Sequence, residues 1–264
     1  MDRERTLTKI GRDIDLRNKT DMRVYPSMIF AVLSIYTGIA FYRLFWMPGA
    51  TEDNMISVVI VGAGLIFAIM YVLVTRAYRH NKRDVAMATD VCALVEDIVP
   101  NASSDPNISS MRKEIGTNIK QKVLFLVNFV ALTPAALGVL VYVRGYGDNP
   151  EMLALWMMVS SFFFSSLIIL SNINYSKNHE RRFIRFSDAT VAFFESVGIS
   201  MAGYEKVIGG RNVKLLAIIS VATFGLFLIP WLCISMRDFN RHIDQQWNFE
   251  NNLLEALGLL IRKS

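Results

Sequence analysis

The sequence contains few of the residues from which redox and metal sites are most often built. It has two cysteines, Cys92 and Cys233, and three histidines among its 264 residues. The cysteines stand far apart along the chain, so we expect neither a disulfide nor a redox pair. The motifs G-x-x-x-x-G-K, G-x-S-x-G and H-E-x-x-H, which indicate a phosphate-binding loop, a nucleophilic serine and a zinc site, do not occur. An enzyme function therefore has no support in the sequence, and no cofactor is expected.

Charged residues are also scarce, at 19% of the chain, whereas a soluble domain usually has about 25%. The apolar residues are gathered into blocks, and a helix needs about 20 of them to cross a bilayer. Five blocks reach that length: Ser27–Trp46, Asn54–Thr75, Val123–Val143, Met152–Ser176 and Leu215–Met236. Four of them lack Asp, Glu, Lys and Arg altogether. We therefore predict an all-α integral membrane protein with about five transmembrane helices.

The basic residues predict how such a chain is oriented. Lys and Arg gather in segments 1–25, 76–122 and 177–214, while the short loops after the first and third spans hold almost none. The positive-inside rule then predicts a multi-pass protein of the plasma membrane with its N-terminus in the cytoplasm. Its expected partners are the lipid bilayer, with anionic headgroups against the basic loops, and other membrane subunits or a second copy of itself. Basic and aromatic residues do not alternate, so no nucleic acid is expected.

One unit is repeated along the chain. Two spans followed by an amphipathic helix occur twice, about 99 residues apart, and a partial third copy has one span and one helix. The predicted units are a basic N-terminal segment (1–26), a first repeat (27–100), a loop-like linker (101–121), a second repeat (122–200) and a partial third repeat (201–264). All three histidines fall at the same place in the repeat, shortly after a span.

Each amphipathic helix carries one apolar stripe. Its members recur at helical spacing: Ala88, Val91, Val95 and Ile98 in the first helix, Phe183, Phe186, Thr190, Phe194 and Val197 in the second, and Phe239, Ile243, Trp247, Leu254, Leu257 and Ile261 in the third. Such stripes predict helices that either pack on each other or lie on a membrane surface.

The C-terminal part of the chain resembles a known group of proteins. The segment NRHIDQQWNFE follows a span of the pattern R…S-x-x-T-x-G…W, and together they are similar to small multi-pass prokaryotic membrane proteins of a family of unknown function. The resemblance covers roughly residues 211–252 and, less closely, 23–46. It implies short membrane hairpins and nothing about chemistry.

The histidines are the first candidate site. His80, His179 and His242 suggest a metal or haem, but ligands usually stand at close spacings such as H-x-x-x-H, and none occurs here. The predicted topology also puts His242 on the opposite side of the membrane from the other two. We therefore interpret them as polar interfacial residues and predict no metal; if the tail lay on the same side, all three could converge.

Polar and small residues within the spans form the second candidate site. They are Asn128, Pro134, Ser160, Ser161, Ser165 and Ser166, with the small residues Gly62 and Gly64. Transport pathways are usually marked by buried carboxylates, Lys or Arg, which are missing from the middle of these spans. Helix packing is therefore the favoured role, and a pathway is the alternative.

These observations lead to three functional hypotheses. The first is a structural or interaction subunit of a membrane complex, one that also associates with itself. The alternative is a transporter or channel for a small solute. The third is a membrane enzyme with a histidine-bound metal.

Overall fold

The computed structural model describes residues 3–46, 52–100, 102–115, 149–210, 212–223 and 228–264, together with residues 133, 134, 137, 138, 140–142, 144, 145 and 147. The regular structure of these residues is entirely helical. The all-α part of the predicted fold class is therefore confirmed.

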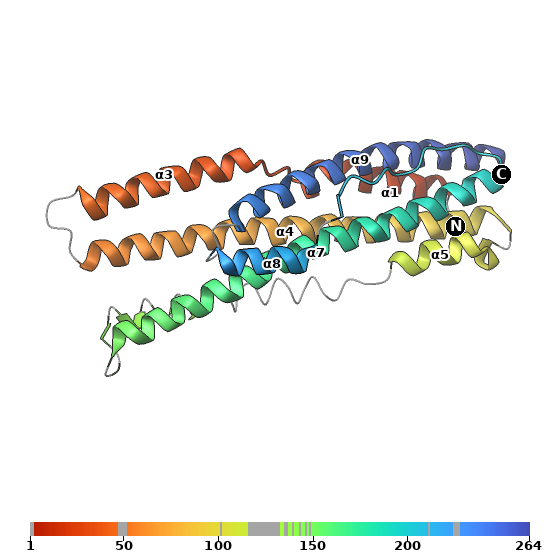
Figure 1. The fold of residues 1–264 in the computed structure, drawn as a ribbon. Helices are drawn as coiled ribbons and strands as arrows, with labels where there is room; N and C mark the ends of the chain where they lie inside the picture. The colour runs from red at the N-terminus through yellow and green to blue at the C-terminus, as the bar shows by residue number, and fades with distance from the viewer. Residues whose placement is uncertain are drawn as a thin grey trace.

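Three long helices set the length of the molecule. α4 (Glu52–Ile98) and α7 (Pro150–Ser196) have 47 residues each, so each is about 70 Å long, and α9 (Leu228–Lys263) has 36 residues. The shorter helices are α1 (Arg3–Asp15), α2 (Arg17–Thr20), α3 (Pro26–Phe45), η1 (Ala102–Ser104), α5 (Pro106–Ile115) and α8 (Val213–Ala222). Figure 1 shows that α4, α7 and α9 all run in the same direction along the molecule.

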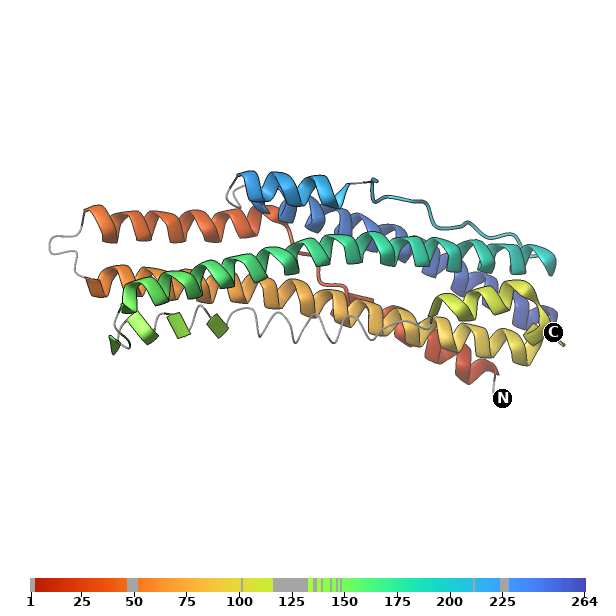
Figure 2. The same ribbon diagram turned by 60° about the horizontal axis from the view of Figure 1, so that its bottom comes forward.

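The two ends of the molecule differ in how tightly the helices pack. At one end each helix packs against two neighbours, in the order α4, α1, α9, α7, α5 and back to α4. Both chain termini lie at this end (Figures 1 and 2). At the other end α3 lies beside the first half of α4, and the first half of α7 diverges from them. We call the first end the helical bundle.

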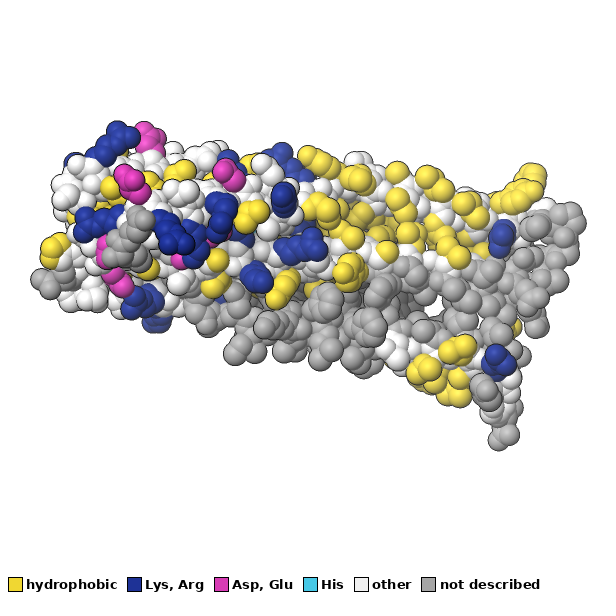
Figure 3. Space-filling view, turned by 180° about the vertical axis from the view of Figure 1, so that it is seen from behind, with side chains coloured by type: hydrophobic (Ala, Val, Ile, Leu, Met, Phe, Trp, Pro, Cys, Tyr) yellow, Lys and Arg dark blue, Asp and Glu magenta, His cyan; other side chains and the backbone are white. Residues whose placement is uncertain are grey.

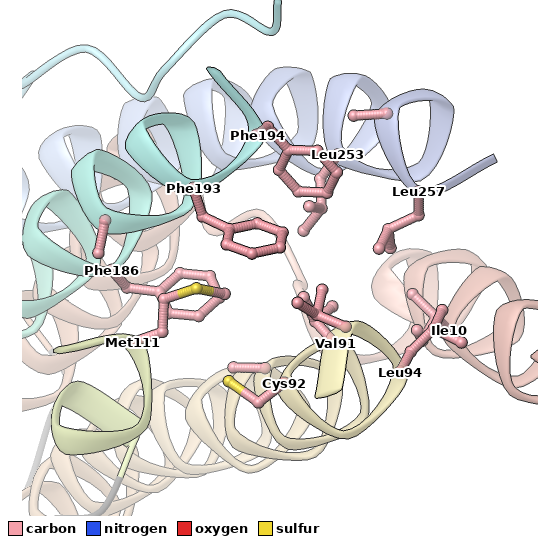
Figure 4. Packing of buried hydrophobic residues seen from close by; sticks show 14 of the residues in the cluster. Ile10, Val91, Cys92, Leu94, Met111, Phe186, Phe193, Phe194, Leu253 and Leu257 are labelled. Carbon is pink, nitrogen blue, oxygen red and sulfur yellow. The ribbon is translucent and has the colours of Figure 1, made fainter. Parts of the chain in front are cut away.

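The bundle is held together by one apolar core. All three predicted stripes contribute to it, and the most deeply buried members include Val91, Phe194 and Leu257, each with no exposed surface. Figure 4 shows side chains from α1, α4, α5, α7 and α9 pointing into the same space. Of the two arrangements that the stripes allowed, packing of the helices on each other is the one that forms.

Two helices of the bundle were missed by the sequence analysis. Residues 1–26 were expected only as a polar segment, but Ile10 and Ile14 stand one helical turn apart in α1 and are buried in the core. The linker 101–121 was expected as a loop, but its first half forms η1 and α5. Asp105 initiates α5, since its carboxylate accepts the backbone N–H of Asn107 at 2.7 Å, and Pro106 suits the first helical position.

α7 ends at a glycine. Gly198 has φ of +72°, and the backbone N–H groups of Gly198 and Ile199 donate to the carbonyls of Glu195 and Phe194 at 3.0 and 2.8 Å. These bonds form a Schellman motif, which favours glycine because a left-handed conformation strains other residues. Residues 199–210 then lead back toward α8 without regular structure, and we call them the return segment.

The predicted membrane spans are not supported. Within the described residues, no helix combines the length and the apolar character that crossing a membrane requires. The fifth predicted span, Leu215–Met236, is divided between α8 and α9, and the ten residues of α8 extend only about 15 Å, half of a bilayer core. Most of the third, Val123–Val143, lies outside the described residues. The predictions of an integral, multi-pass transmembrane protein and of a plasma-membrane location are contradicted by this finding.

The core makes one prediction about stability. Leu253 on α9 has no exposed surface, so Leu253→Ala should leave a cavity and lower the free energy of unfolding by about 2–5 kcal/mol. Leu259→Ala on the same helix removes the same atoms from a side chain that is 41% exposed, and should change stability by less than about 0.5 kcal/mol. Thermal unfolding followed by circular dichroism measures both; equal losses would contradict the assigned core.

Candidate metal centre

The three histidines of the chain lie together inside the bundle. His80 comes from α4, His179 from α7 and His242 from α9, and their exposed fractions are 0%, 4% and 0%. The ring centroids are 5.1–5.5 Å apart, and one nitrogen atom from each ring lies within 4.8 Å of the others. The expectation that His242 lies on the opposite side from the other two is therefore wrong.

The position of each histidine along its helix explains the convergence. His80 is the 29th residue of α4, and His179 is the 30th residue of α7. Since the two helices run in the same direction from the same end of the molecule, the two residues reach the same height (Figure 1). His242 joins them from α9, which enters at mid-length. Equivalent positions of the sequence repeat therefore lie at the same height along the bundle.

The Nε2 atoms of all three rings are available as metal ligands. Among the described residues, none of these atoms has a hydrogen-bond partner. The other nitrogen of His80, Nδ1, lies 2.9 Å from Oδ1 of the buried Asp21 carboxylate. Because an ionised carboxylate only accepts, Nδ1 must carry a proton, and in the neutral ring Nε2 then keeps a lone pair. A carboxylate behind a histidine is the usual arrangement around a bound metal.

A second chain of hydrogen bonds fixes His242 in the same way. Nδ1 of His242 lies 2.7 Å from the hydroxyl of Tyr204, and that hydroxyl donates to Glu180 Oε1 at 3.0 Å. The tyrosine therefore accepts from Nδ1–H of His242, and Nε2 again keeps its lone pair. The same Glu180 oxygen accepts the backbone N–H groups of Val207 and Ile208, both at 2.8 Å. Glu180 thus anchors the return segment that supplies Tyr204.

Asp84 is the carboxylate that faces the Nε2 atoms of two of the rings. Its Oδ2 lies 3.2 Å from Nε2 of His80 and 3.2 Å from Nε2 of His179, and within the described residues that oxygen has no hydrogen-bond partner. Its other oxygen, Oδ1, accepts from the Gln246 amide at 2.6 Å and from Arg83 at 3.1 Å. One side of the carboxylate is therefore held by neighbours, and the other faces the histidines.

Arg83 is surrounded by acidic groups. Its guanidinium lies 2.8 Å from Asp21 and 2.6 Å from Glu250, both fully buried. Glu250 also accepts from Gln246 at 2.9 Å, and the indole N–H of Trp247 donates to Asp21 at 2.9 Å. A buried guanidinium needs such partners, because an unpaired charge away from water is very costly.

The electrostatics favour the protonation states that a metal ion needs at His179, His242 and Asp84. Burial, opposed by Asp84, lowers the pKa of His179, and burial together with the other two rings holds the pKa of His242 well below its ordinary value. Burial alone would raise the pKa of the Asp84 carboxyl, but His80, His179 and Arg83 hold it well below its usual range. The pKa of His80 is raised, since the carboxylates of Asp84 and Asp21 outweigh the effect of burial. Two neutral imidazoles and an ionised carboxylate therefore face one point.

Aromatic rings and a small cavity border the centre. Phe239 meets His80 edge-on at 5.2 Å between centroids, and Phe183 meets His242 edge-on at 5.8 Å. A cavity of about 40 Å³ lies between α4, α5 and α7, and its lining includes Asp84, His179 and Glu114. That volume exceeds the roughly 10–15 Å³ that a water molecule needs. Aromatic rings therefore cover one side of the centre, and a small cavity borders another side.

The second set of predicted site residues lies elsewhere. Gly62 is buried against α3, where a Cβ would overlap the Tyr36 hydroxyl, which donates to the Val58 carbonyl at 2.8 Å. Ser160 donates to the Trp156 carbonyl of its own helix at 2.8 Å. The first contact packs α3 against α4, and the second lies within α7.

The remaining members of that set give less information. Pro134 is half-buried in a helical turn. Asn128 lies outside the described residues, as do the side chains of Ser161, Ser165 and Ser166 and the surroundings of Gly64. A pathway through these residues stays a prediction.

The sequence analysis missed the carboxylates and the tyrosine of the centre. Asp84 stands four residues after His80, in the stretch HNKRD, and that spacing places both side chains on one face of a helix. This H-x-x-x-D pattern was a local signal. Asp21 and Tyr204 come from segments far away in the chain, and no local pattern points to them.

Comparisons of this chain with protein-family models, with curated proteins and with solved structures found no match. The resemblance of residues 211–252 to a family of membrane proteins therefore stays a prediction.

Glu250 gives a test of the buried charge network. Burial, opposed by Arg83, raises the pKa of Glu250 from 4.5 to about 7. Because the pKa is higher in the folded state, the folded state binds the proton more tightly than the unfolded state does. The free energy of unfolding should therefore fall as the pH rises from about 5 to about 8. Glu250→Gln should remove this loss and be more stable than the parent chain at pH 8 by about 1–3 kcal/mol.

Thermal unfolding across that pH range measures the difference. Glu255→Gln changes an exposed glutamate on the same helix and serves as the control. A pH dependence that is the same in the parent chain and in Glu250→Gln would contradict the assignment.

Proposed function

We propose that this protein binds a divalent transition-metal ion between α4, α7 and α9, with His80, His179 and His242 as ligands. The observation that carries the proposal is the convergence of three buried rings whose ligand nitrogens lie within 4.8 Å of one another. Imidazole nitrogen is a preferred ligand of Zn²⁺, Cu²⁺, Ni²⁺ and iron. The proposal keeps the histidine-bound metal among the original hypotheses and leaves out its membrane setting.

The surroundings of the rings support the proposal. Nδ1 of His80 is hydrogen-bonded to Asp21, and Nδ1 of His242 is hydrogen-bonded to Tyr204. The opposite nitrogen of each ring, Nε2, is left for a metal ion. Outer partners of this kind orient a ligand and change metal affinity by about 10–100-fold when they are removed.

Metal titration of purified protein tests the proposal. After removal of metal with a chelator, the chain should bind one Co²⁺ or Zn²⁺ per molecule, measured by calorimetry and by the visible absorption of Co²⁺. His179→Asn and His242→Asn should each weaken binding by more than about 100-fold, because even an outer partner is worth 10–100-fold. The chain has no histidine outside the centre, so no other histidine contributes background.

Asn248→Ala supplies the control, since it changes an exposed side chain on the same helix as His242. It should bind the ion as the parent chain does. A parent chain that takes up no ion, or histidine variants that bind it equally well, would refute the proposed function.

A second function, self-association, is favoured by a separate observation. Figure 3 shows charged side chains gathered over the bundle end and hydrophobic ones over the other half of this face. The exposed apolar side chains of α3 are Met28, Phe30, Val32, Ile35, Ile39, Phe41, Tyr42 and Phe45. An exposed apolar patch of this kind marks an interaction surface. We propose that α3 contacts a second copy of the chain.

Substitution of glutamate into that surface tests the second function. The double variant Ile35→Glu, Phe41→Glu should reduce an oligomeric parent to the monomer mass in size-exclusion chromatography with light scattering. Ile218→Glu on α8, a position that is 65% exposed, serves as the control and should keep the parent mass. A monomeric parent, or a double variant that remains oligomeric, would rule out association through α3.

A further inference from the structure

We propose that Asp84 is the fourth ligand of the metal ion, so that four protein side chains close the site and fasten α4, α7 and α9 to one another. The inference rests on the proposed metal binding and assigns the complete ligand set and its role.

The distances around Asp84 match a four-coordinate ion. Zn²⁺ binds imidazole nitrogen and carboxylate oxygen at about 2.0–2.1 Å, so two ligand atoms of a tetrahedral site are about 3.3–3.4 Å apart. Oδ2 of Asp84 lies 3.2 Å from Nε2 of His80 and 3.2 Å from Nε2 of His179. The oxygen is therefore at the distance from each nitrogen that two ligands of one tetrahedral ion have.

The way in which Asp84 is held also fits a ligand. Gln246 and Arg83 bind Oδ1 and orient the carboxylate, while Oδ2 has no hydrogen-bond partner among the described residues. A carboxylate that served only to pair with Arg83 could turn both oxygens toward it. Here Oδ1 is held by Gln246 and Arg83, and Oδ2 faces the Nε2 atoms of His80 and His179.

The charge of the surrounding network favours a bound cation. Asp21, Asp84 and Glu250 bring three carboxylates against the one guanidinium of Arg83, and all four side chains are almost fully buried. Within this set the carboxylates outnumber the guanidinium, even when Glu250, whose pKa is about 7, is protonated. A buried excess charge is costly unless it is paired or coordinates a metal, so the network favours a bound cation.

Four protein ligands define a structural site. Catalytic zinc sites keep one position for water or substrate, whereas structural sites are filled by the protein. The ligands come from three long helices, so the free energy of metal binding also stabilises their packing. The cavity lined by Asp84 and His179 gives the ion a route into the closed centre.

Cobalt spectroscopy of the full chain tests the assignment. Asp84→Asn should weaken Co²⁺ binding by more than about 100-fold and change the position and intensity of the visible bands. Asp90→Asn is the matched control, since it makes the same substitution on α4 at a carboxylate that pairs with Lys9 at 2.7 Å and belongs to no part of the centre. It should change the affinity by less than about tenfold and leave the bands in place. Circular dichroism checks that both variants are folded.

Measurements on the parent chain keep the test valid if Asp84→Asn does not fold. X-ray absorption of the Zn²⁺ form should show four nitrogen or oxygen ligands, and azide should leave the Co²⁺ spectrum unchanged because no position is open. A spectrum that shifts with azide, or an Asp84→Asn variant that binds Co²⁺ like the parent, would overturn this inference while leaving the proposed function intact. A parent chain that binds no metal would remove both.

Discussion

A layer of buried polar side chains crosses the helical bundle at the level of the three histidines, and the rest of the structure is arranged to satisfy it. Buried charges are tolerated only when they are paired or coordinate a metal. Each segment that reaches this layer brings a partner: the N-terminal segment brings Asp21, the return segment brings Tyr204, and α9 brings Gln246 and Glu250. The path of the chain outside the long helices is therefore set largely by what the layer needs.

The apolar core and the polar layer have different roles. The core supplies the larger part of the driving force, but apolar stripes on five helices tolerate small slips along one another. The contacts of Arg83 with Asp21 and Glu250 allow much less freedom, because a slip of one helical turn would leave a buried charge without a partner. We infer that the polar layer fixes the register of α4 relative to α9, while the core holds the five bundle helices together.

The sequence predicted the local parts of this arrangement well. The stripes identified the buried faces of the three bundle helices. The missed helices had short or weak signals: α5 has ten residues, and α1 stood in a segment interpreted only by its charge. The long apolar blocks predicted membrane spans, a conclusion that the described helices contradict.

The candidate centre shows a different limit of sequence reasoning. Spacing along one helix pairs His80 with Asp84, but His179 and His242 lie 99 and 162 residues further along the chain. Only the shared direction of α4, α7 and α9 converts equal places in the repeat into equal heights.

The strongest argument that this convergence is functional is energetic. A buried polar atom without a partner costs about 1–3 kcal/mol. Here the Nε2 atoms of His80, His179 and His242 and Oδ2 of Asp84 are all in that position within the part of the chain that the structure describes. These four atoms face one another, and His80, His242 and Asp84 carry oriented hydrogen-bond partners on their far sides. A single metal ion would satisfy all four at once.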